Sequence, residues 1–402
     1  MISRYAGIAP KGDLLLIKRL CERFQGKRFL HVNSTREGGG VAEILQRMVP
    51  LLAGMGIDAR WMVIEGDPFF FEITKKIHNA LQGNSEYITE GMWEHYFEVN
   101  RRNSSVMDLD AEMVLVHDPQ PAPLIEFRKG GHWVWRCHID VSEPQKVIFD
   151  FLSFYARKYE SAVFSIPRFA KALGIDEFII PPSIDPVSEK NRDLTEQEVE
   201  ETLSRFGIDT DRPILLQVSR FDRFKDPTGV IQAYRMVKKY NDCILVLAGS
   251  PATDDPEGER VLSEVREYGK GDPDLHILLL PPSDKDINAL QRAADVILQK
   301  SLKEGFGLTV SEAMWKGKPI VGGAAGGIPL QIIHGVTGFL VHSVEGAAFR
   351  VRQILSDPAM GRAMGSAAKE YVRNNFLITR QMRDYLAVWY FLDQGRGNVL
   401  RV

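Results

Sequence analysis

Short apolar runs alternate with amphipathic stretches along the whole chain. Runs of this kind, bounded by turn residues, are typical of buried parallel strands that are covered by helices. Each half of the chain has enough of them for its own doubly wound sheet. The strands that we predict are Phe29–Val32, Ala59–Ile64, Met113–His117, Trp133–His138, Ala162–Phe164 and Phe178–Ile180 in the first half, and Ile214–Val218, Ile244–Ala248, His276–Leu280, Val296–Leu298, Ile320–Val321 and Phe339–Val341 in the second.

A polar segment separates the two sets of strands. Turn residues fill Pro181–Pro186, and the run Ser188–Glu200 breaks the alternation. Because 402 residues are too many for one ordinary core, we expect an α/β protein with a Rossmann-like domain at 1–190, a second at 191–375, and a last helix within 376–402 that packs back on the first domain. Open parallel sheets bind ligands at the carboxyl ends of their strands, so we expect two facing domains with a ligand cleft between them.

Composition limits the classes of partner. The net charge of -3 provides no basic field for nucleic acid or for an anionic membrane. The first 24 residues resemble neither a signal peptide nor a membrane span, and the three cysteines, far apart and without metal-ligand spacing, favour a reduced cytoplasm. We expect small-molecule substrates, and we leave the oligomeric state open, with a homodimer as one option.

Three glycines, Gly38, Gly39 and Gly40, follow the first predicted strand and precede an amphipathic run. Without Cβ atoms, this turn lets a phosphate or a sugar approach the backbone and the following helix N-terminus. The spacing is not that of a dinucleotide fingerprint or a P-loop. The alternative is a flexible turn that only reverses the chain, but one glycine would have been enough for that.

Three cations follow the first strand of the second half, where a doubly wound sheet places its ligand. Arg220 provides a rigid fork for phosphate oxygens, and Lys225 a compact charge that can follow a departing diphosphate. We assign Arg223 to a solvated loop.

The segment Glu304–Glu312 carries two carboxylates around a glycine-bearing turn. Thr309 and Glu312 have the spacing of a capping box, with Gly317 as the stop of the helix. Glu304 would then lie just outside the helix, beside free N–H groups of Gly305–Leu308 that favour an anion. Together these groups suit a nucleotide sugar, although the same spacing starts many helices that bind nothing.

Two polar clusters follow adjacent strands of the first half: His117, Asp118 and Gln120 after one, and His138 and Asp140 after the next. Such groups at one rim suit the hydroxyls of a sugar. A metal site is the competing interpretation, but no other residues have ligand spacing, so we predict no metal and no cofactor.

Taken in order, these motifs resemble those of the retaining glycosyltransferases of family four, a resemblance that covers nearly the whole chain and includes Gly326-Gly327-Ile328. The segments Val116–Pro121 and Trp135–Asp140 are similar to the trehalose-forming branch of that family, to which archaeal synthases and fungal phosphorylases belong. Two departures stand out. Gln331 replaces a common glutamate, and Pro182–Asp185 replaces the common Asn-Gly-Val-Asp.

The resemblance implies a glycosyltransferase B-type fold and transfer of glucose from UDP-glucose or ADP-glucose to glucose, giving α,α-trehalose with retention. It implies that Arg220 and Lys225 neutralise the leaving diphosphate and that Glu304 holds the donor glucose, with Gly39, Gly40 and Gly305–Thr309 lining the donor site and Glu312 meeting the ribose. It places His138 near the transferred glucose and His117, Asp118, Gln120 and Asp140 around the acceptor. It implies no Mg²⁺.

Alternatives remain at this point. A trehalose phosphorylase would use phosphate in place of the nucleotide, and another member of the family would use a different acceptor. A nucleotide-sugar isomerase would need no acceptor, and a non-catalytic binding protein would not need the two polar clusters of the first half.

Overall fold

A computed structural model describes residues 2–37, 39–208, 211–249, 256–281 and 283–395. The chain forms two compact units, Met1–Ser183 with Ile378–Val402, and Ile184–Leu377. The division lies between Ser183 and Ile184, whereas we expected it near residue 190. The second unit already includes Ile184 because the Ile184 N–H donates to the carbonyl of Phe376 at 2.9 Å and Ile184 forms a bridge with Leu377.

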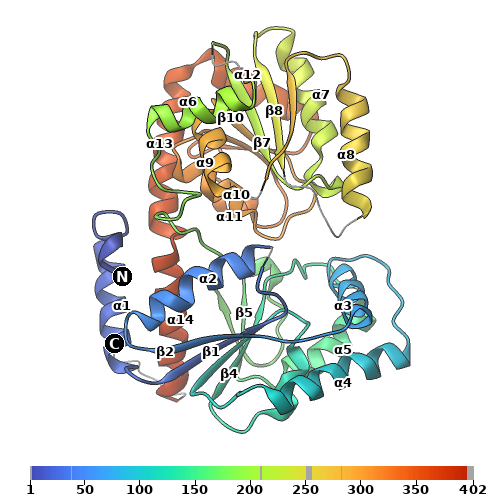
Figure 1. The fold of residues 1–402 in the computed structure, drawn as a ribbon, viewed down its shortest axis with the longest axis vertical. Helices are drawn as coiled ribbons and strands as arrows, with labels where there is room; N and C mark the ends of the chain where they lie inside the picture. The colour runs from blue at the N-terminus through green and yellow to red at the C-terminus, as the bar shows by residue number, and fades with distance from the viewer. Residues whose placement is uncertain (1, 38, 209–210, 250–255, 282, 396–402) are drawn as a thin grey trace. The chain divides into compact units, whose positions relative to one another are not determined.

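The first unit is built on a six-stranded parallel sheet with the order β2-β1-β3-β4-β5-β6 (Figure 1). The chain thus starts in the middle and winds outward in both directions, which places a change of strand order between β1 and β3. The strands are β1 (Arg28–Asn33), β2 (Asp58–Val63), β3 (Met113–His117), β4 (His132–Cys137), β5 (Ser161–Phe164) and β6 (Asp176–Ile179).

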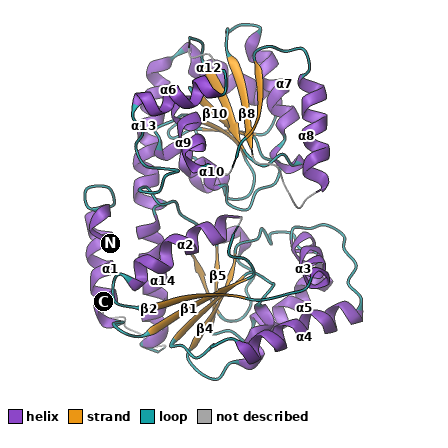
Figure 2. Ribbon diagram, in the orientation of Figure 1, coloured by secondary structure: helices purple, strands orange, loops and turns teal. Residues whose placement is uncertain are grey.

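Helices cover both faces of this sheet (Figure 2). One layer contains α1, α2 and α14, and the other contains α3, α4 and α5. The last helix belongs to this unit and packs on α1, α2 and β4, with Trp389 stacked on Phe24 at 4.0 Å between ring centroids. The helices are α1 (Lys11–Arg23), α2 (Gly39–Ala53), α3 (Pro68–Leu81), α4 (Glu90–Val106), α5 (Lys146–Ala156) and α14 (Ile378–Asp393), with 3-10 turns η1 (Ile2–Tyr5), η2 (Ala122–Phe127) and η3 (Pro167–Phe169).

The second unit repeats the plan with the order β12-β11-β10-β7-β8-β9, again entirely parallel. Its strands are β7 (Ile214–Val218), β8 (Ile244–Gly249), β9 (Leu275–Leu279), β10 (Val296–Gln299), β11 (Ile320–Gly323) and β12 (Phe339–Val341). Its helices are α6 (Glu196–Arg205), α7 (Pro227–Lys238), α8 (Pro256–Gly269), α9 (Asp284–Ala293), α10 (Leu308–Trp315), α11 (Ile328–Gln331), α12 (Val344–Ser356) and α13 (Pro358–Asn375), with the 3-10 turn η4 (Arg223–Lys225).

Local sequence explains where many of these helices begin. Asp67 caps α3 by accepting from the Phe70 N–H with Pro68 at the first helical position, and Thr195 and Glu198 form a complete capping box on α6. Inner strands such as β3 and β7 are buried because apolar side chains point to both faces, which is why they appear as continuous apolar runs. The strands β2, β6 and β9 are partly exposed. Each strand predicted from the sequence is present, with ends shifted by at most a few residues. None of the helices in the described ranges is long and apolar enough to cross a bilayer.

Candidate functional site

Three histidines on adjacent strands of the first unit form a connected chain. His117 ends β3, His138 follows β4, and His31 lies inside β1, on the other side of β3. His31 Nδ1 lies 3.0 Å from His117 Nε2, and His117 Nδ1 lies 3.0 Å from His138 Nε2. The parallel register of β3 and β4, which pairs His117 with Arg136, brings these rings together. We call His31, His117, His138, Asp118 and Arg136 the histidine cluster.

Asp118 ties the ends of β3 and β4 to each other. Its Oδ1 accepts from the His138 N–H at 2.7 Å, and its own N–H donates to the Arg136 carbonyl at 2.7 Å. Its φ of 64° is in the left-handed region, which aspartate tolerates better than most residues. Burial raises the pKa of Asp118 to about 7, opposed by the hydrogen bond from His138 and the charge of Arg136. Near neutral pH this carboxyl can therefore either donate to or accept from a hydroxyl.

The histidines of this cluster are neutral. Burial lowers the pKa of His31 to about 3 and the pKa of His117 and of His138 well below the usual value, and the charge of the buried Arg136 lowers the last two further. The Arg136 guanidinium donates to Ser165 Oγ at 3.2 Å. Neutral imidazoles offer one donor and one acceptor each, which suits uncharged ligands.

Gln120 and Asp140, the other two residues predicted at this rim, are half-buried. The Gln120 carbonyl accepts from Asn100 Nδ2 at 3.0 Å, while its side-chain Oε1 is buried without a hydrogen-bond partner. Asp140 Oδ1 accepts from the Ser142 N–H at 2.9 Å. Neither side chain bonds to the histidine chain.

In the second unit, the structure brings Lys225 and Glu304 together from loops far apart in the sequence. Lys225 Nζ lies 2.6 Å from Glu304 Oε2, and Ser301 Oγ donates to the same oxygen at 3.1 Å. Asp222 caps the turn η4 through the Lys225 N–H, and Gln217 Nε2 donates to the Lys225 carbonyl at 2.8 Å. The side chains of Lys225 and Glu304 are 15% and 10% exposed, so the pair is largely sheltered from solvent.

Arg220 lies apart from this pair. Its side chain is 66% exposed, and Nη2 is 3.5 Å from Asp222 Oδ2. Arg223, which we assigned to the surface, pairs with Glu264 at 3.0 Å with half of its side chain exposed. A second buried ion pair, Lys300 with Asp226, lies at the start of α7. We call Lys225, Glu304, Asp226 and Lys300 the cationic cluster.

Two glycines fix the backbone that carries Glu304. A Cβ on Gly326 would lie 1.6 Å from the Glu304 carbonyl oxygen, and Gly326 has a φ of 51°. The Gly327 N–H donates to the Gly305 carbonyl at 2.9 Å, and a Cβ there would lie 2.8 Å from the Phe306 Cα. The turn after β11 therefore packs directly on Glu304–Phe306, and only glycine allows this approach.

The start of α10 differs from the prediction. The helix begins at Leu308 with Gly307 as its N-cap at a φ of 84°, so Thr309 is the second helical residue and the predicted capping box with Glu312 is wrong. Gly307 enters the helix from the left-handed region, which leaves no side chain bonded to the first N–H groups. The predicted stop is confirmed, because the N–H groups of Gly317 and Lys318 close a Schellman motif on Met314 and Ala313.

Glu312 lies in the second turn of α10 and is almost fully buried. Its Oε1 is 3.9 Å from Lys190 Nζ, and Lys316 Nζ donates to its carbonyl at 3.2 Å. Burial lowers the pKa of Lys316, against the opposing effect of Glu312.

The glycine loop of the first unit is described in part. Gly38 lies outside the described residues, and α2 begins at Gly39 with a φ of 76°. Gly39 and Gly40 are exposed, and a Cβ on Gly39 would meet no atom within 4 Å. Glycine is favoured at Gly39 by backbone conformation and not by crowding.

Within the described ranges, no group of three or more His, Cys, Asp or Glu side chains is arranged to hold a metal ion. Cys21, Cys137 and Cys243 are buried and free.

Comparisons with known proteins place both units. Residues 31–171 match the family model of the trehalose synthase N-terminal domain, and residues 198–371 match that of the glycosyl transferases group 1. The trehalose synthase of Pyrococcus horikoshii is 48% identical over 397 residues, which cover 96% of this chain and 94% of that protein. The chain belongs to the trehalose synthase family of glycosyltransferases.

Two more distant matches are to proteins with other names. A trehalose phosphorylase of Grifola frondosa is 25% identical over 452 residues, covering 97% of this chain and 60% of that protein. The crystal structure of the α,α-trehalose 6-phosphate synthase of Burkholderia multivorans superposes with a TM-score of 0.75 over 92% of this chain and 100% of that chain, at 14% identity. The likeness to that structure shows a fold of two Rossmann-like domains, the glycosyltransferase B type.

One departure of this trehalose synthase family member now has a physical account. Gln331 is fully buried, its Nε2 donates to the Phe306 carbonyl at 2.6 Å, and its Oε1 accepts from Ser311 Oγ at 2.5 Å. A glutamate could accept from Ser311 but could not donate to Phe306 without a proton. Gln331 thus joins the Glu304 loop to α10 in this chain.

Of the residues in the histidine cluster, His31 was not predicted from the sequence, whereas Arg136 belongs to the segment Trp135–Asp140 that was already singled out. His31 is hidden inside an apolar strand, and only the strand order β1-β3-β4 makes it a neighbour of His117. The available signal was a polar ring at a fully buried strand position, which needs a hydrogen-bond partner.

Proposed function

We propose that this chain transfers glucose from a nucleoside diphosphate glucose to free glucose, giving α,α-trehalose and a nucleoside diphosphate. The observation that carries the proposal is the sheltered pair of Lys225 and Glu304 at 2.6 Å. A cation and a carboxylate held together are a donor for phosphate oxygens beside an acceptor for sugar hydroxyls. A hexose linked to a diphosphate needs this combination.

The donor half of the proposal uses the second unit. Lys225 and the exposed Arg220 neutralise the diphosphate, and the uncapped N–H groups at Leu308 and Thr309 add the positive end of α10. Glu304 accepts hydrogen bonds from the glucose hydroxyls, and Glu312 is assigned to the ribose. Gly305, Phe306 and Gly307 line the approach, and Gly39 and Gly40 of the first unit contribute the start of α2.

The acceptor half uses the histidine cluster. A free glucose carries no charge, so neutral donors and acceptors are appropriate, and His117, Asp118, Gln120 and Asp140 are assigned to it. His138 is assigned to the glucose that is transferred.

The chemical step follows from retention of the α configuration. The bond from C1 to the phosphate oxygen breaks while the acceptor oxygen bonds to C1 on the same face, and the acceptor proton passes to the departing phosphate oxygen. We assign no carboxylate of the chain as a covalent nucleophile, which a double displacement would need. Negative charge grows on the diphosphate in the transition state, so Lys225 and Arg220 act where stabilisation raises the rate.

The test is an incubation of the protein with glucose and, separately, UDP-glucose, ADP-glucose or α-glucose 1-phosphate, with products resolved by ¹³C NMR. Trehalose with nucleoside diphosphate supports the proposal and identifies the base. Trehalose formed with inorganic phosphate from glucose 1-phosphate alone would make the chain a phosphorylase, and a different disaccharide would change the acceptor.

A reverse incubation with trehalose and nucleoside diphosphate tests reversibility. A parallel series with EDTA tests whether side chains of the protein neutralise the diphosphate without a metal ion. Loss of activity in EDTA, restored by Mg²⁺, would contradict that assignment.

A further inference from the structure

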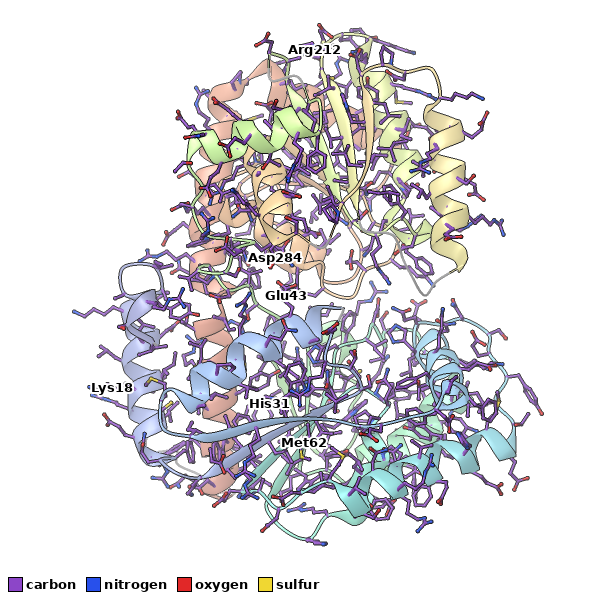
Figure 3. The ribbon with its side chains drawn as sticks, in the orientation of Figure 1. Lys18, His31, Glu43, Met62, Arg212 and Asp284 are labelled. Atoms are coloured by element: carbon purple, nitrogen blue, oxygen red, sulfur yellow. The ribbon has the colours of Figure 1, made fainter. Side chains whose placement is uncertain are left out.

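The three histidines are joined end to end, so their protons cannot be placed independently. Figure 3 marks His31 in the first unit. The bonds use His31 Nδ1, both nitrogens of His117, and His138 Nε2. His31 Nε2 is therefore left at one end of the row of three histidines, and His138 Nδ1 is left at the other end. The rings lie nearly parallel, at 20° and 19°, so the contacts form one continuous row.

Neutral rings allow only two proton arrangements. A neutral imidazole has one N–H and one lone pair, and each hydrogen bond needs one of each. If His117 carries its proton on Nδ1, then His138 Nε2 must accept, and His31 must donate from Nδ1. If His117 carries it on Nε2, all three rings must carry it there. Any mixed arrangement sets two lone pairs or two N–H groups against each other at 3.0 Å.

His31, at the buried end of the row of histidines, distinguishes the two proton arrangements. His31 is fully buried, and its Nε2 has no hydrogen-bond partner. With every proton on Nε2, an N–H would be stranded there, whereas with every proton on Nδ1 only a lone pair is left. Buried N–H groups without a partner are rarer in proteins than acceptors that lack one.

We infer that His31 and His117 are positioning residues that hold His138 in its Nδ1–H form, so that His138 presents a hydrogen-bond donor to the substrate. The arrangement runs from the buried strand β1 through β3 to the end of β4. His138 then has no lone pair available, because its Nε2 accepts from His117. It can donate to a sugar hydroxyl or a phosphate oxygen, but it cannot take a proton as a general base.

This inference rests on the proposed function only for the identity of the ligand that His138 contacts. If His138 cannot act as a base in the proposed reaction, the departing phosphate oxygen must take the proton from the hydroxyl of the acceptor glucose. The groups around the row on neighbouring elements are Asp118 and Arg136 at the strand ends and Tyr385 of α14.

The direct test is a two-bond ¹H–¹⁵N spectrum of ¹⁵N-histidine-labelled full chain at pH 7, with resonances assigned from single His→Asn variants. We expect His31, His117 and His138 all to show a protonated Nδ1 and an unprotonated Nε2. His132, whose Nδ1 is 2.7 Å from Glu160 Oε2, provides a reference in the same spectrum. A protonated Nε2 or an averaged signal in any of the three rings overturns the inference. The measurement needs no turnover, so it stands apart from the test of the proposed function.

Two variants test the positioning role. His31→Asn keeps an N–H at the position of Nδ1, whereas His31→Leu removes it. In His31→Leu we expect the His138 signal to become averaged and kcat to fall about 10-fold, as is typical when a group behind a functional side chain is removed. The KM of the nucleotide donor should stay the same, and His31→Asn should restore both kcat and the signal. A folded His31→Leu with the His138 signal of the parent chain would overturn the inference.

Discussion

The histidine cluster and the cationic cluster accommodate polar side chains away from solvent in opposite ways. In the histidine cluster burial lowers the pKa of the three histidines and raises the pKa of Asp118 to about 7, so Arg136 is the one group there that keeps a full charge. In the cationic cluster Lys225 and Glu304 pair with each other at 2.6 Å. The first arrangement suits uncharged hydroxyls and the second an anion that can replace the carboxylate as partner of the lysine. The difference supports the ligands that we propose for the two units.

The largest effect that separates the clusters is expected for Lys225→Ala. Removing the cation that we assign to the diphosphate should lower kcat by about 10³-fold, as loss of one preorganised donor to a developing charge does. Steady-state kinetics with the nucleotide donor measure this. Lys239→Ala, an exposed lysine of the same unit, is the matched control and should leave kcat unchanged. A loss below tenfold in Lys225→Ala would remove the lysine from the chemistry.

Gln331→Glu should destabilise the second unit by about 1–3 kcal/mol, because the buried carbonyl of Phe306 loses its donor. Hydrogen exchange of the peptides covering 300–331 measures the change in this variant. Gln46→Glu makes the same substitution at an exposed residue that donates to the Arg36 carbonyl, and it should change stability by less than about 0.5 kcal/mol. Exchange of the peptides covering α2 (Gly39–Ala53) measures the change in this control. Equal effects of the two variants would mean that burial does not matter here.

Acid should weaken the first unit through its histidines. The pKa of His31 is about 3 when folded and near 6.5 when unfolded, so its contribution is complete above pH 6.5 and is lost as the pH falls towards 3. Asp118 acts in the opposite direction, since its raised pKa favours the folded state as the pH falls from about 7 towards 4. Three histidines outweigh one carboxyl.

His31→Asn should therefore reduce the slope of unfolding free energy against pH, between pH 4 and 6, by about 1.4 kcal/mol per pH unit. Denaturant unfolding followed by tryptophan fluorescence reports on this unit, which contains Trp61, Trp93, Trp133, Trp135 and Trp389. An unchanged slope would show that His31 is not neutral in the folded chain.

The smallest expected effect concerns salt. Raising the salt concentration should increase the KM of the nucleotide donor by less than tenfold and leave the KM of glucose unchanged, because ions screen the diphosphate but not neutral hydroxyls. Kinetics at two concentrations of NaCl measure both constants. Parallel changes in the two would remove the distinction between the clusters.

The strands could be predicted from the sequence, but the side-chain contacts between distant elements could not. Apolar runs located each strand, because a strand buried on both faces has little choice of residue. Gly317 was correctly identified as a helix stop, since a Schellman motif depends on local backbone. Thr309 was wrongly assigned as a cap, because Gly307 could enter the helix as well and no local rule decides between them. His31 was not recognised, because its partner is set by strand order. Gln331 was noted as a departure, but its partners were not predicted, because they are set by the packing of distant loops.

The pairing of Ile184 with Leu377 has a consequence for the architecture of the gene product. The entire second unit is one uninterrupted length of chain whose first residue, Ile184, forms a parallel bridge with its last, Leu377, and donates its N–H to the carbonyl of Phe376. The second unit is therefore a domain inserted between the sixth strand and the final helix of the first unit, and its two ends lie side by side. A segment of this kind can be excised as 184–377, or permuted by joining its ends with a short linker, without cutting a strand of either sheet.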